Sequence, residues 1–181
     1  MLNFSVLKTK VKISPLLFVV LTLFFLADRK GIALPVVFFS LCHEAAHFLV
    51  LFWEKVSPQS VSLCMTGIRV VLSDHVETGK KIKVFIAGFS INFFFAALFC
   101  FLGKKTWSVI NLCLGCFTFL PLPSTDGGAV LKLLFPCSIS RQIGKISGVF
   151  SLFCLLLLLW KTNSISLCLP IFYLFFAILS Y

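Results

Sequence analysis

Long apolar runs separated by short polar and basic segments dominate the chain. A membrane-spanning helix needs about 20 predominantly apolar residues, and fewer where flanking lysines reach the interface. Six runs qualify on this scale, of which the first and fourth are short: 13–27, 32–53, 82–103, 107–122, 143–160 and 165–181. We therefore predict an all-α fold, a polytopic membrane bundle of about six transmembrane helices.

The segment 54–81 is the one sizeable polar stretch between these runs. Within it, Val61 and Leu63 alternate with Ser62 and Cys64, and the pair Thr66-Gly67 follows shortly afterwards. Alternation with a period of two, followed by a turn signal, is typical of a β-hairpin. We expect either a small hairpin at the membrane surface or an irregular interfacial loop, and the pattern alone does not decide between them.

The composition agrees with a membrane protein. Hydrophobic residues make up 60% of the 181 residues and charged residues only 12%, whereas an ordinary soluble domain has about half apolar and a quarter charged residues. No segment is polar enough to form a second domain. We therefore expect residues 1–181 to form a single membrane-embedded domain.

The basic residues fix the expected topology. The formal net charge is +10, but the lysines and arginines fall between the apolar runs, where they favour anionic lipid headgroups as partners over nucleic acid. With six spans and a cytoplasmic N-terminus, most of them lie inside: Lys8, Lys10, Lys12, Lys55, Arg69, Lys80, Lys81, Lys83, Lys132, Arg141 and Lys145. The other side receives Arg29, Lys30, Lys104, Lys105 and Lys161. Because positive charge is enriched inside, we predict a multi-pass cell-membrane protein with both termini in the cytoplasm.

The second apolar run contains the motif HEAAH. His43 and His47 lie four residues apart, about 40° from each other around a helix, so that both imidazoles share one face. Glu44 lies about 60° from His47, close enough to act on a water that a metal between the histidines would bind. A chance HExxH in this composition has a probability on the order of 10⁻³. The alternative is a structural hydrogen-bonded cluster.

A hydrolytic zinc site takes three protein ligands and leaves one position for water. Asp126 is the one remaining acid at membrane depth, and it follows Pro121 and Pro123, which would break the fourth run and free the backbone to turn. Gly127 and Gly128 would let the chain approach a metal closely. Alternatively, Asp126 caps a short helix at 127–135, and one carboxylate could serve both purposes.

The third run carries two further candidate residues. Gly88 permits tight contact between helices, and Asn92 offers an amide inside the bundle. Asn92 would either position the backbone of a substrate or form a hydrogen bond with a neighbouring helix.

These motifs together resemble the site-2 protease family of intramembrane metalloproteases. That family couples HExxH in one helix with Asn-x-x-Pro-x-x-x-x-Asp-Gly in a later one, a spacing that Pro121, Asp126 and Gly127 match. Gly88 and Asn92 are similar to the Gly-Pro-x-x-Asn element of the family. The resemblance covers about 32–135, the expected catalytic core. Two positions depart from the pattern: Thr118 stands where Asn is usual, and Phe89 follows Gly88 in place of Pro.

The resemblance implies regulated intramembrane proteolysis of membrane-spanning or membrane-tethered proteins. Zn²⁺ would be bound by His43, His47 and Asp126, while Glu44 would take a proton from the attacking water. Thr118 would then stand in for the Asn that helps to hold the substrate carbonyl. The layout of six spans, with the motif in the second, is similar to the branch of stage IV sporulation protein FB, which processes a sporulation sigma-factor precursor; neither a CBS nor a PDZ domain is expected here.

Two other classes of function use the same ligands. A zinc-binding membrane transporter would need polar groups along a path, but the last two apolar runs contain no acid or histidine. A catalytically inactive pseudoprotease would bind membrane proteins without cutting them, and the departure at Thr118 favours that reading. Retention of Glu44, which binding alone does not require, favours the protease.

Overall fold

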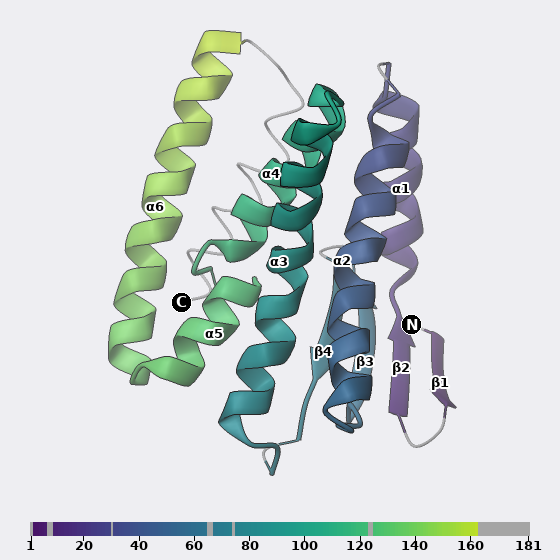
Figure 1. The fold of residues 1–181 in the computed structure, drawn as a ribbon, viewed down its shortest axis with the longest axis vertical. Coiled ribbons are helices and arrows are strands. Elements are labelled where there is room, and N and C mark those ends of the chain that lie inside the picture. Colours follow the sequence, from purple (N-terminus) through teal and green to yellow (C-terminus); the bar gives the residue numbers. More distant parts are fainter. Residues whose placement is uncertain are drawn as a thin grey trace. The chain divides into compact units, whose positions relative to one another are not determined.

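Figure 1 shows a computed structural model of the chain, which describes residues 2–6, 9–29, 31–64, 67–73, 75–122 and 125–162. They fall into two compact units, Met1–Gly115 and Cys116–Tyr181. Each unit is taken by itself below, and the expectation of a single domain stays a prediction.

Five of the six predicted apolar runs form helices, and the sixth, 165–181, lies outside the described residues. The helices are α1 (Pro15–Ala27), α2 (Ala33–Trp53), α3 (Thr78–Phe101), α4 (Lys105–Phe119), α5 (Asp126–Leu134) and α6 (Cys137–Thr162). Among the described residues, three helical segments are long and apolar enough to cross a membrane: Ala33–Trp53, Thr78–Phe101 and Cys137–Leu157. The expected helical membrane fold is confirmed.

A four-stranded sheet accompanies the helices of the first unit. Its strands are β1 (Leu2–Val6), β2 (Thr9–Ile13), β3 (Ser60–Cys64) and β4 (Gly67–Val71), in the order β1-β2-β3-β4. β3 and β4 are antiparallel, which confirms the hairpin and rules out the irregular loop. The N-terminal hairpin was not expected, although polar and apolar residues alternate in it, because its lysines were taken only as topology signals. The fold is therefore not purely helical.

The pairing of β2 with β3 fixes the course of α1 and α2. These strands are parallel neighbours, with Val11 opposite Val61. Parallel strands need a long crossover connection, and here the chain leaves β2 through α1 and returns through α2 to β3 (Figure 1). Residues 9–13 and 60–64 consequently lie at the same end of this unit.

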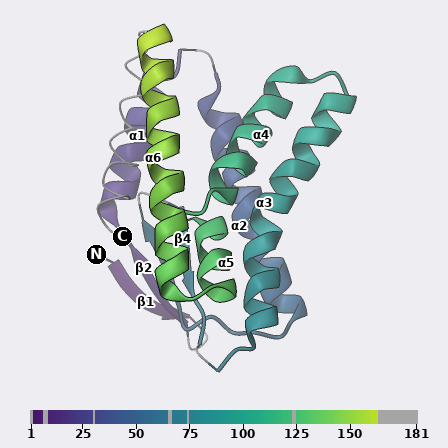
Figure 2. The same cartoon turned by 90° about the vertical axis from the view of Figure 1, so that its left-hand side faces the viewer.

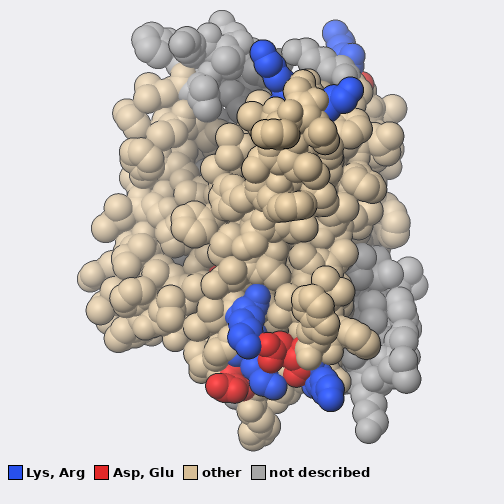
Figure 3. Space-filling model, viewed as in Figure 1, with Lys and Arg blue, Asp and Glu red and all other residues tan. Residues whose placement is uncertain are grey.

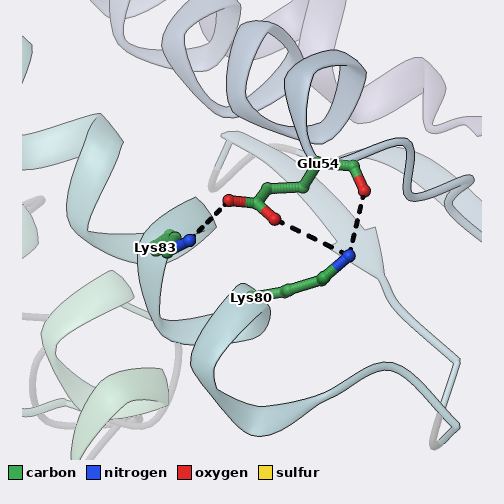
Figure 4. Close-up of polar contacts among 3 residues, drawn as sticks. All are labelled: Glu54, Lys80 and Lys83. Atoms are coloured by element: carbon green, nitrogen blue, oxygen red, sulfur yellow. Dashed lines mark hydrogen bonds and ion pairs between the residues drawn. The ribbon is translucent and has the colours of Figure 1, made fainter.

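Charged residues join α2 to α3 at the end near the sheet. Glu54, directly after α2, accepts a hydrogen bond from Lys83 Nζ at 2.7 Å and lies 3.7 Å from Lys80 Nζ (Figure 4). The hydrogen bond from Lys83 lowers the pKa of Glu54, so that the carboxylate stays ionised at a lower pH than an ordinary glutamate. On the face shown in Figure 3, charged side chains gather at two ends, and the broad middle is uncharged, as a bilayer requires.

The buried stripe between α2 and α3 contains three polar residues among apolar and small ones, while many large apolar side chains face outward. The buried residues of α2 include Phe39, His43, His47 and Leu51, and those of α3 are Val84, Gly88, Asn92 and Ala96. Four-residue spacing puts each set on one face of its helix. Phe52 and Phe101 are 80% and 95% exposed, as lipid-facing residues are.

In the second unit, the end of α4 leads through a short turn into α5, which packs against α6 (Figure 2). The turn brings Asp126 to the first position of α5.

Candidate metal centre

Two histidines of α2 form the core of the candidate site. His43 and His47 are one helical turn apart and are both buried, at 7% and 5% exposure. Their Nε2 atoms face each other at 3.2 Å, and the two rings are nearly perpendicular, at 85°. The expectation that the HEAAH spacing puts both imidazoles on one helix face is confirmed.

The remaining ring nitrogens of the pair contact α3. His47 Nδ1 donates a hydrogen bond to the backbone carbonyl of Val84 at 2.7 Å. This bond places the proton of His47 on Nδ1 and leaves the lone pair of Nε2 directed toward His43. His43 Nδ1 lies 3.0 Å from Nδ2 of Asn92. Val84 therefore contacts His47 and Asn92 contacts His43, and these two residues of α3 lie two helical turns apart.

Gly88 provides the space that the two rings occupy. A Cβ atom at this position would lie 2.5 Å from both Cε1 and Nε2 of His47, and 2.6 Å from Cε1 of His43. Since non-bonded carbon atoms are normally about 3.5–4.0 Å apart, no side chain fits without displacing the imidazoles. The tight helix contact predicted for Gly88 is therefore a contact with the histidine pair itself.

The separation of the two Nε2 atoms suits one zinc ion. Zinc–nitrogen bonds of about 2.0–2.1 Å at tetrahedral angles place two ligand nitrogens about 3.3–3.4 Å apart. The observed 3.2 Å is close to this value. The chemistry of His47 agrees, since zinc-binding imidazoles typically donate their other ring N–H to an acceptor such as a backbone carbonyl. The two histidines thus meet the requirements for half of a tetrahedral site.

Glu44 lies on the same turn of α2 and is half-buried, between the lipid-exposed and the fully buried faces of the helix. Its place directly after His43 is the one predicted from the motif. The general-base role expected for it stays a prediction.

In the second unit, the turn before α5 determines how Asp126 is presented. Thr125, not Asp126, is the N-cap of α5, and its hydroxyl oxygen accepts a hydrogen bond from the N–H of Gly128 at 3.3 Å. The same hydroxyl donates to the carbonyl of Leu120. The cap that the sequence offered as an alternative role for Asp126 is therefore supplied by its neighbour.

Gly127 and Gly128 are required by this turn. A Cβ at Gly127 would overlap the carbonyl of Phe119, and one at Gly128 would overlap that of Leu122. The two glycines let the turn fold against itself, whereas their predicted role was to let the chain approach a metal.

The two residues that the sequence offered for substrate positioning, Asn92 and Thr118, differ in outcome. Asn92 was expected either to hold a substrate or to join two helices, and it joins α3 to α2 through His43. Thr118 lies in α4, one residue before the last, and is half-buried. The substrate-positioning role of Thr118 stays a prediction.

Sequence reasoning missed two contributors. The carbonyl of Val84 is a backbone group and leaves no signal in the residue type, although Val84 lies one turn before Gly88 on the same face. The Thr125 cap had a signal, since Ser or Thr just before a helix is the usual N-cap.

Comparison with known proteins points in one direction. No protein-family model matches the sequence, and no curated protein matches it either. Among solved structures, the chain is similar to the "Site-2 Protease from Methanocaldococcus jannaschii", with a TM-score of 0.68 and 17% sequence identity. The match covers 99% of this chain and 94% of the other. The two proteins share a fold.

Proposed function

We propose that this protein is an intramembrane zinc metalloprotease. The observation that carries the proposal is the buried pair of His43 and His47 on an apolar helix. Their Nε2 atoms are 3.2 Å apart, and the two histidines are the first and last residues of an HExxH motif. Ionisable groups at this depth are costly and normally mark a functional site. The fold shared with a site-2 protease supports the same conclusion.

Asp126 is the proposed third ligand. His43, His47 and Asp126 each offer one ligand atom, and three protein ligands are what a hydrolytic zinc site requires. Two observations support this role. Thr125 is the N-cap of α5, so Asp126 is not the capping residue, and the spacing from Pro121 to Asp126-Gly127 matches the family motif.

Zinc bound by these residues would lower the pKa of a water toward 7 and polarise a peptide carbonyl. Glu44 would take the proton from the attacking water and deliver it to the leaving amine. The hydroxyl of Thr118 would donate a hydrogen bond to the substrate carbonyl, in place of the usual Asn side chain.

The substrate would be a membrane-spanning or membrane-tethered protein. Its scissile segment must be extended, because helical amides are hydrogen-bonded and shielded. β4 is an edge of the sheet, so a substrate strand could pair with it. Processing of a sporulation sigma-factor precursor is the most specific version of this proposal, and it rests on the layout of the spans alone.

We further propose that the chain crosses the cell membrane several times, with both termini in the cytoplasm, and that its basic loops contact anionic lipids rather than nucleic acid. The charged pairs of Glu54 then mark the cytoplasmic edge of α2. At 1.5 Å per residue, His47 lies about 10 Å and His43 about 16 Å below that edge.

The rival functions and the protease differ in whether they require the carboxylate of Glu44. A zinc-binding transporter or a pseudoprotease would hold the metal without needing a general base beside it. Glu44→Gln keeps the size and polarity of the side chain and leaves the proposed ligands intact, so zinc should stay bound. Because general-base catalysis contributes about 10² to 10⁴ in rate, hydrolysis should fall to background.

Both quantities are measured on the same detergent-purified samples. Zinc content comes from elemental analysis, and cleavage is followed with a panel of single-span membrane proteins that carry helix-breaking residues in their spans. Glu54→Gln, a change of the same kind at the membrane edge, is the matched control and should cleave like the wild type. A Glu44→Gln protein that cleaves at the wild-type rate would refute the proposed mechanism.

A further inference from the structure

Asn92 is a buried amide whose two polar atoms are in different situations. It is 1% exposed, and Nδ2 lies 3.0 Å from His43 Nδ1. Its Oδ1 is buried and has no hydrogen-bond partner among the residues that the structure describes. Leaving a buried carbonyl oxygen without a hydrogen bond is destabilising.

The hydrogen bonds of the histidine pair can run in one direction, from Asn92 through His43 and His47 to the carbonyl of Val84. With Asn92 Nδ2 as the donor, His43 Nδ1 accepts, and the proton of His43 is on Nε2. That proton points to His47 Nε2 at 3.2 Å, while His47 Nδ1 donates to the carbonyl of Val84. In this arrangement Nε2 of His43 carries a proton and cannot bind a metal.

Metal binding requires a different arrangement at His43 only. To offer the lone pair of Nε2, His43 must carry its proton on Nδ1, as His47 already does toward Val84. Asn92 Nδ2 would then be a donor facing a donor. Rotating the amide by half a turn places Oδ1 at the same position, where it accepts the Nδ1 proton, and Nδ2 takes the position that Oδ1 held.

We propose that Asn92 is the positioning residue for His43. Its amide oxygen accepts the Nδ1 proton and fixes the ring form that presents Nε2 to zinc. This inference deepens the proposed function and rests on it. Asn92 acts through His43, and it requires no contact with substrate.

The affinity for zinc tests the proposal directly. Asn92→Leu keeps the approximate size but removes the acceptor, so zinc affinity should fall by about 10- to 100-fold, the usual effect of losing such a partner. Asn92→Asp offers only acceptor oxygens and should bind zinc at least as tightly as the wild type. The measurement is competition with a chromogenic chelator in detergent.

A matched control separates this role from the loss of any buried amide. Asn111 is fully buried on α4, and its Nδ2 donates to the carbonyl of Trp107 at 2.9 Å. Among the described residues its Oδ1 has no hydrogen-bond partner, as is the case for Asn92. Asn111→Leu should leave zinc affinity unchanged. A folded Asn92→Leu protein that binds zinc like the wild type would overturn the proposal, as would an Asn92→Asp protein that loses as much affinity as Asn92→Leu.

The unmodified protein provides a second measurement, which does not depend on whether a variant folds. With ¹⁵N-labelled histidine, the zinc-bound protein should carry the protons of both His43 and His47 on Nδ1. His75, which is exposed, serves as the reference. A zinc-bound protein in which His43 carries its proton on Nε2 would overturn the proposal. A protein that binds zinc in this way but cleaves nothing refutes the protease and leaves the role of Asn92 intact.

Discussion

Replacing Gly88 with alanine tests whether the geometry between α2 and α3 creates the metal centre. The added Cβ would lie 2.5 Å from Nε2 and Cε1 of His47 and 2.6 Å from Cε1 of His43. Relief to normal contact at about 3.5 Å requires a displacement of about 1 Å. The rings cannot simply rotate away, because Val84 and Asn92 hold their Nδ1 atoms.

A displacement of this size exceeds what a zinc site tolerates. Ligand distances in such sites hold to about ±0.2 Å, so a shift of about 1 Å should remove one histidine from coordination. We expect zinc affinity to fall by at least about 100-fold, beyond the range for losing an outer hydrogen bond. Overpacking costs about 1–3 kcal/mol, and the better helix propensity of alanine returns up to about 1 kcal/mol. The protein should therefore still fold.

The assay compares zinc affinity and melting temperature for Gly88→Ala and Gly79→Ala. Gly79 lies on the same helix, and the nearest atom to its added Cβ is Glu77 Oε1 at 3.6 Å, an ordinary contact. Gly79→Ala therefore gains the same helix propensity without a clash and should bind zinc normally. Wild-type zinc affinity in Gly88→Ala would show that the histidine pair is not confined by α3, and the reasoning would be wrong.

Two further predictions concern catalysis and topology. Thr118→Asn restores the amide that the family usually presents to the reacting carbonyl, so cleavage should be preserved or faster; a large loss of turnover in a folded Thr118→Asn protein would contradict the motif alignment. Reporter fusions after Lys80, in the first turn of α3, should place that end of the helix in the cytoplasm together with the N-terminus, because β2 and β3 pair at one end of the unit; reporters on opposite sides would contradict the pairing.

The sequence by itself determined the helices and the pair of imidazoles. Spans follow from the length of apolar runs, because a bilayer demands internally hydrogen-bonded backbone. The relation of His43 to His47 follows from the 3.6-residue period, which holds in any helix. The alternation of polar and apolar residues predicted the β3–β4 hairpin. The same alternation occurs in β1 and β2, but the lysines there were interpreted only as topology signals.

Only the tertiary structure decided how the histidines are oriented and what surrounds them. The contacts of Val84 and Asn92 depend on which faces of α2 and α3 meet, and no local pattern encodes that register. Gly88 is essential because two rings from another helix fill the volume of its missing Cβ. Likewise, the pairing of β2 with β3 joins residues that are about 50 positions apart in the sequence. Local periodicity fixes what a helix presents, and packing between distant segments fixes which atoms it meets.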